Sequence, residues 1–141
     1  MVPPDDSSTA RPSSGAGPHT PRPVAALARA GLLGPGTLYV HGNSLPDDVL
    51  RRIADSGGTA SIAPAVEAAM GHGAPMTDRL RAAGVTTGLG ADVVTTVAGD
   101  MFSLMRAAPA TGHLSADRHR PAAAVLRMAT QDGAPAHLRH A

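Results

Sequence analysis

The sequence predicts an α/β fold in which helices cover a parallel sheet. Short apolar runs typical of strands alternate along the chain with stretches that carry apolar residues at helical spacing. Only a few residues separate consecutive elements, and glycines follow several of the helical stretches where each should stop. One helix followed by three strand–helix pairs is the order expected of a parallel sheet.

The elements follow in order from residue 24. Apolar residues at helical spacing, closed by glycines, predict a short helix over 24–36. The run TLYVH, 37–41, predicts a strand that ends in His41. A helix is predicted over 45–58, because acids occupy its first turn and glycines its end. The remaining predicted elements are a strand over 59–64, a helix over 74–84, a strand over 85–92 and a helix over 98–108.

The two ends of the chain differ from its middle. Residues 1–22 are rich in Pro, Ser and Gly with almost no large apolar residue, so we expect a disordered leader that cannot offset its ordering entropy. The foldable domain is predicted over 23–136, with a short tail over 137–141.

Composition narrows the classes of function. The net charge of +1 gives no electrostatic case for nucleic acid or an anionic membrane, and the aromatic fraction of 1% offers no stacking platform for single strands. All 12 basic residues are Arg, which base composition of the gene explains as well as phosphate recognition does. There is no Cys, no secretory signal and no apolar run of about 18 residues. We therefore expect a cytoplasmic protein that binds neither nucleic acid nor membrane.

Two ionisable residues stand where predicted strands end. His41 closes the first strand and Asp92 the third. Ligands of parallel α/β folds collect at the carboxyl ends of strands. The spacing alone leaves simpler interpretations open, because Asp is a good cap after a strand and a strand-end His can be satisfied by backbone.

Three strand–helix units are too few to close a barrel and would cover an open sheet poorly. The motifs LYVHGNSLPDDVLRRIADSGGTASIAP, MGHGAP, LRAAGVTTGLGAD, DMFSLMRAA and RMATQDGAPA occur in one order. Together, over about residues 24–136, they resemble the later part of the amidohydrolase superfamily, in the cytosine-deaminase-like group that includes atrazine and triazine chlorohydrolases. The resemblance implies a partial (β/α)₈ TIM-type barrel, about strands six to eight with their helices.

The resemblance also implies a chemistry. Members of the family use zinc or iron to activate a water that hydrolyses C–N or C–Cl bonds of nitrogen heterocycles. His41 matches a catalytic histidine beside the substrate, and Asp92 matches a catalytic aspartate that touches the metal and carries the proton. The other metal ligands implied, a His-x-His pair and a further His, have no counterpart here. ATQDGAPA resembles the helix that follows the last strand of the barrel.

Glu67 and His72 are candidate substrate-binding residues. Both are predicted to lie in the loop after the second strand, where the family contacts its substrate. Relatives usually carry Asn there, so the pattern departs from the commonest one. Glu67 could accept a hydrogen bond from a ring N–H or an amine, or be a solvated loop or helix residue. Asp100 is interpreted as a charge at a helix N-terminus.

Three functional hypotheses follow. The first is a metal-dependent amidohydrolase-type hydrolase acting on a small aminated heterocycle, in which this chain alone has weak or no turnover. The second is a non-catalytic remnant or interaction module that pairs with a complementing chain or forms a homo-oligomer. The third is an independent small α/β binding domain.

Overall fold

The computed structural model describes residues 21–73, 76–111 and 122–134. The predicted leader up to residue 20 and the tail over 137–141 lie outside the described residues. The first helix begins at Pro21, two residues before the predicted start of the domain. In chain order the elements are α1 (Pro21–Arg29), β1 (Leu38–Val40), α2 (Asp47–Asp55), β2 (Thr59–Ile62), α3 (Pro64–Ala69), α4 (Thr77–Ala82), β3 (Thr86–Leu89), α5 (Met101–Thr111) and α6 (Ala122–Ala129).

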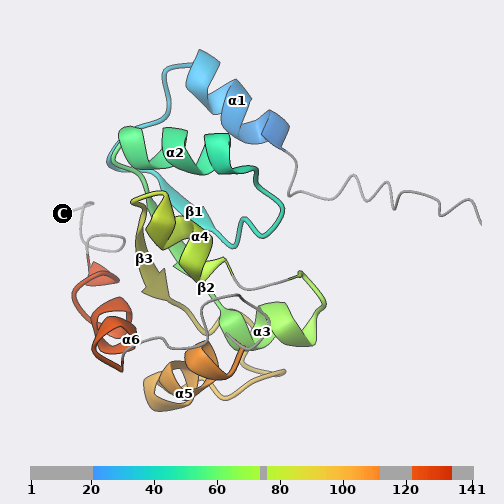
Figure 1. Cartoon of the computed structure of the whole chain (residues 1–141). Helices are drawn as coiled ribbons and strands as arrows, with labels where there is room; N and C mark the ends of the chain where they lie inside the picture. Colours follow the sequence, from blue (N-terminus) through green and yellow to red (C-terminus); the bar gives the residue numbers. More distant parts are fainter. Residues whose placement is uncertain (1–20, 74–75, 112–121, 135–141) are drawn as a thin grey trace, which may run out of the picture.

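The strands form a three-stranded parallel sheet in the order β1-β2-β3 (Figure 1). Leu38 pairs with Thr59, and Thr59 pairs with Thr86, so the strands start level with one another. Their carboxyl ends therefore lie at one edge of the sheet, as the sequence predicted. Helix α2 joins β1 to β2, while α3 and α4 join β2 to β3.

One face of the sheet packs on helices to form the core. Ala60 and Ile62 of β2 are 1% exposed and belong to the same apolar cluster as Leu50 and Ile53 of α2. The amphipathic spacing of α2 turns its apolar residues toward the sheet and leaves its arginines exposed. Burial of side chains of this size is the main force that holds the helix layer on the sheet.

The other face of the sheet is more open. Side chains alternate between the two faces of a strand, so Val40 and Thr86 lie on the face opposite Ala60. Val40 is 58% exposed and Thr86 is exposed as well. Strands of parallel sheets are ordinarily buried on both faces. This face of the sheet is therefore partly open in the described residues.

The observed elements differ from the predicted ones at two places. Pro64 was interpreted as the end of a strand, but it is the first residue of α3, because Pro fits the first turn of a helix without losing a hydrogen bond. In the stretch 129–136, which resembles a helix after the last strand, α6 ends at Ala129, residues 130–133 form turns, Ala134 is helical, and the last two residues lie outside the described part. Figure 1 shows α5 and α6 near α3 and β3, and α3 packs against α5.

Candidate functional site

The predicted site residues lie just beyond the carboxyl ends of the strands. His41 follows β1 directly, whereas Asp92 lies three residues after β3, which ends at Leu89 and not at the predicted residue 92. Both have left-handed backbone, with φ of 63° for His41 and 56° for Asp92, and they are the two non-glycine residues with positive φ in the described part of the chain. Such strained backbone concentrates at functional sites. No sequence pattern indicated it.

Glu67 occupies the interior beneath His41. The predicted loop position is wrong, because Glu67 is in α3, and the solvated alternative is also excluded because the side chain is 0% exposed. Its Oε1 atom is 2.9 Å from His41 Nδ1 and accepts a hydrogen bond from the backbone N–H of Ala63 at 2.9 Å. Its Oε2 atom accepts one from Asn43 Nδ2 at 3.2 Å. These donors offset the cost of burying a carboxylate.

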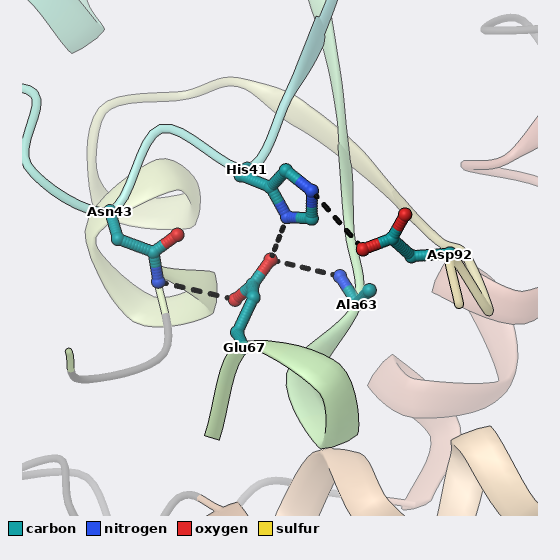
Figure 2. Close-up of polar contacts among 5 residues, drawn as sticks. All are labelled: His41, Asn43, Ala63, Glu67 and Asp92. Atoms are coloured by element: carbon teal, nitrogen blue, oxygen red, sulfur yellow. Dashed lines mark hydrogen bonds and ion pairs between the residues drawn. The ribbon is translucent and has the colours of Figure 1, made fainter. Parts of the chain in front are cut away.

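His41 lies between two carboxylates, as Figure 2 shows. Its Nδ1 atom contacts Glu67, and its Nε2 atom is 3.5 Å from Asp92 Oδ2. The second contact is long for a hydrogen bond. The side chain of His41 is 17% exposed and that of Asp92 is 34% exposed. The line of three groups therefore runs from the buried interior to the surface, and Asp92 is its accessible end.

His72 and Asn43 complete the surroundings of His41. His72 follows α3 and lies between Gly71 and Gly73, both with positive φ. Its ring meets that of His41 edge to face, with the centroids 5.6 Å apart. Asn43 was not singled out in the sequence. Its place two residues after the strand-end histidine was the signal that could have found it.

The described residues do not complete a metal site. A catalytic zinc ion takes three protein ligands and a water. No group of three or more His, Cys, Asp or Glu side chains suited to a metal ion occurs among residues 21–73, 76–111 and 122–134. Asp92 stays a predicted ligand whose companions would come from elsewhere. The predicted zinc or iron therefore does not fit these residues alone.

Two further polar groups outside this cluster have shifted pKa values. Hydrogen bonds from the side chain and the backbone N–H of Ser103 lower the pKa of Asp100 below its ordinary 3.8. Asp100 precedes α5 and accepts the Ser103 N–H at 2.9 Å, so it stands at the helix N-terminus as predicted. Burial raises the pKa of Tyr39 above its ordinary 10.0.

Known proteins resemble the chain in sequence and in fold. A 5-methylthioadenosine/S-adenosylhomocysteine deaminase of Haloarcula marismortui is 37% identical over 120 residues, which are 82% of this chain and 28% of that protein. A zinc-bound adenosine deaminase of Xanthomonas campestris superposes with a TM-score of 0.74 at 29% identity, over 81% of this chain and 27% of that one.

A third likeness concerns the fold alone. The atrazine chlorohydrolase TrzN of Arthrobacter aurescens, in complex with zinc and atraton, gives a TM-score of 0.71 at 24% identity over 84% of this chain. No protein-family model matches the chain. The chain thus spans about a quarter of the length of the proteins that it matches, at 27% and 28%.

Fold and likenesses together define a class: an α/β unit shared with hydrolytic deaminases and chlorohydrolases. The chain belongs to the amidohydrolase superfamily and corresponds to part of its enzymes. The predicted resemblance is confirmed at this level. The structure describes no helix long and apolar enough to cross a membrane.

Proposed function

We propose that this chain carries the His41–Asp92 part of the active site of a hydrolase that acts on C–N bonds of small aminated heterocycles. The observation that supports it most is the line Glu67–His41–Asp92 at the carboxyl ends of three parallel strands. The names of the similar proteins, an adenosine deaminase and a deaminase of adenosine derivatives, favour an aminated purine or related ring. Cleavage of C–Cl bonds, favoured by the chlorohydrolase likeness, is the alternative within this class.

The proposed roles of Asp92 and His41 are those that the family resemblance implies, and the geometry is compatible with them. Water adds to the ring carbon that bears the amine, and Asp92 accepts the proton that the water gives up. Asp92 then returns that proton to the amine, which leaves as ammonia. The second proton of the water ends on the adjacent ring nitrogen as the ring carbon becomes a carbonyl. His41 Nε2, 3.5 Å from Asp92 Oδ2, lies where it can hydrogen-bond the reacting water or the adduct. Glu67 and His72 stay predicted substrate-binding residues.

The proposal requires residues beyond those described. The activating zinc or iron needs further protein ligands, and the full barrel needs further strands. A complementing chain or segment would supply both. The exposed Val40 on the open face of the sheet supports such an addition. The chain by itself should therefore turn over substrate weakly or not at all.

A non-catalytic interaction module is the second candidate, favoured by the absence of a metal-ligand cluster in the described ranges. Metal content separates the two in the purified 141-residue chain. Stoichiometric, tightly bound zinc or iron would contradict an incomplete site. Its absence would leave both candidates standing, so a second experiment is needed.

That experiment starts from the coding DNA upstream, read in all frames for a His-x-His and a further histidine. If they are encoded, the joined protein should release ammonia from aminated purines, pyrimidines or triazines, and Asp92→Asn should remove the activity. No release from any of these compounds by a folded, metal-loaded protein would overturn the proposal and favour the interaction module.

A further inference from the structure

Glu67 is more completely enclosed than a substrate ligand should be. Its side chain is 0% exposed, and both carboxylate oxygens accept hydrogen bonds from the chain itself. An ionised carboxylate is an acceptor only, so each of these partners must present a hydrogen. Donors at 2.9 to 3.2 Å from His41, Ala63 and Asn43 surround it. Little capacity is left for a ligand.

The contact with His41 has a consequence for the histidine ring. A neutral imidazole has one N–H and one bare nitrogen, and the partner of one nitrogen sets the role of the other. Because an ionised Glu67 can only accept, the 2.9 Å contact between Oε1 and Nδ1 is a hydrogen bond only when the hydrogen of the neutral ring is on Nδ1. The Nε2 atom then faces Asp92 with its lone pair available. The contact also sets the direction in which the ring points.

Glu67 is well placed to hold this arrangement firmly. Helix α3 begins directly after β2, and the bond from the Ala63 N–H to Glu67 Oε1 ties the carboxylate to the end of that strand. The backbone of His41 is strained, with φ of 63°. A strained residue persists only when its surroundings fix it. Glu67 provides such a fixed point from the neighbouring strand.

We propose that Glu67 is a positioning residue that acts through His41, holding Nδ1–H and aiming Nε2 at Asp92 and the reacting water. Its consequence for catalysis rests on the proposed function, but the arrangement itself does not. The role differs from the predicted one, in which Glu67 contacts the substrate directly.

Ring-nitrogen NMR of the full 141-residue chain tests the proposal without turnover. Spectra of ¹⁵N-labelled protein, recorded over a series of rising pH until the ring signals no longer change, distinguish an N–H nitrogen from a bare one. The wild-type chain should show His41 with its hydrogen on Nδ1. A hydrogen on Nε2 in the wild-type chain would overturn the proposal, and this measurement needs no variant to fold.

Two variants and a matched control sharpen the test. Glu67→Met keeps the volume but removes both acceptors, so the His41 ring should no longer carry its hydrogen mainly on Nδ1. Glu67→Gln keeps one acceptor, so His41 should retain the tautomer with its hydrogen on Nδ1. Val66→Ala, at a residue that is also 0% exposed on α3, should lower the Tm without changing the His41 spectrum. An unchanged His41 tautomer in folded Glu67→Met would overturn the proposal.

Kinetics add a readout if an active assembly is obtained. Loss of ring orientation should lower kcat about 10- to 100-fold, while KM changes little, and Glu67→Gln should recover most of the rate. A large rise in KM with kcat unchanged would instead indicate direct substrate binding and would overturn the positioning role. Failure of the proposed function would show as no ammonia release in any variant, with the NMR result unaffected.

Discussion

The carboxyl ends of the parallel strands carry interacting ionisable groups, whereas the amino end of β3 borders an apolar cavity. At the carboxyl ends, a buried carboxylate, an imidazole and a partly exposed carboxylate form a polar line from Glu67 through His41 to Asp92. Near the amino end of β3, a cavity of about 320 Å³ lies between α4, β3 and α6 and is lined mostly by apolar atoms of residues such as Val85 and Met128. The reactive groups do not converge at this cavity.

This difference indicates that the carboxyl ends, and not the apolar cavity, are the place for catalysis in this fold. An apolar cavity offers volume, but proton transfer requires titratable groups within reach of one another. Backbone strain and interacting ionisable groups coincide at the carboxyl ends, at His41 and Asp92. At the cavity, the ion pair between Arg127 and Asp132 is 3.1 Å long and largely exposed on the arginine side, so it has the features of an ordinary surface pair.

The largest expected effect is a loss of activity from a substitution at the carboxyl ends of the strands. Asp92→Asn removes the proton carrier, and Asn tolerates the left-handed backbone that position 92 requires. In any active assembly we expect ammonia release to fall about 10²- to 10⁴-fold, with little change in Tm. Coupled ammonia detection and thermal unfolding measure the two quantities. Full activity in Asp92→Asn would remove Asp92 from the proposed mechanism.

Near the amino end of β3 we expect a substitution to lower stability and leave the His41 site unchanged. Met128 is 7% exposed and borders the cavity, so Met128→Ala should lower the free energy of unfolding by about 2 kcal/mol, the lower end for a buried Met, since the site is already partly empty. Urea unfolding measures this loss. The His41 ring spectrum should not change, and a shifted spectrum would show that the two ends are coupled.

A smaller effect is expected at the contact between α4 and the loop before α2. Arg79 Nη2 donates to the Leu45 carbonyl at 2.6 Å and contacts Asp47 Oδ1 at 2.6 Å. Both charged side chains are well exposed, so solvent screens the pair. We expect Arg79→Ala to cost roughly 1 kcal/mol in urea unfolding, chiefly from the bond to the carbonyl. Asp47→Ala, as a control, should cost less, and an equal or greater loss would assign the effect to the ion pair.

The smallest expected effect is a pH dependence away from the site. Because the pKa of Asp100 is lowered in the folded protein, its ionised form stabilises the fold above the ordinary pKa of 3.8. That stability is lost as the pH falls through the lowered pKa. Asn also caps helices, so wild type should exceed Asp100→Asn in stability at neutral pH and match it in acid. A constant difference across this range would contradict the assignment.

Much of the fold could be predicted because it depends on local patterns. The apolar spacing of α2 and the glycine after it indicated both the helix and its end, and Gly57 has the positive φ that a stop requires. The order of strands and helices likewise predicted the parallel sheet. Helix α3 was missed because Pro64 fits a strand end and a helix start equally well in sequence.

The sequence by itself determined the α/β order, the family likeness and the position of His41 and Asp92 on the carboxyl-end side of the sheet, although β3 ends at Leu89. Only the tertiary structure decided that Glu67 supports His41, which lies 26 residues away. Local spacing sets which residues form a strand or a helix, but a hydrogen bond between neighbouring strand ends depends on how the strands are brought together. A buried glutamate and a solvated one look alike in sequence, and packing decides which of the two Glu67 is.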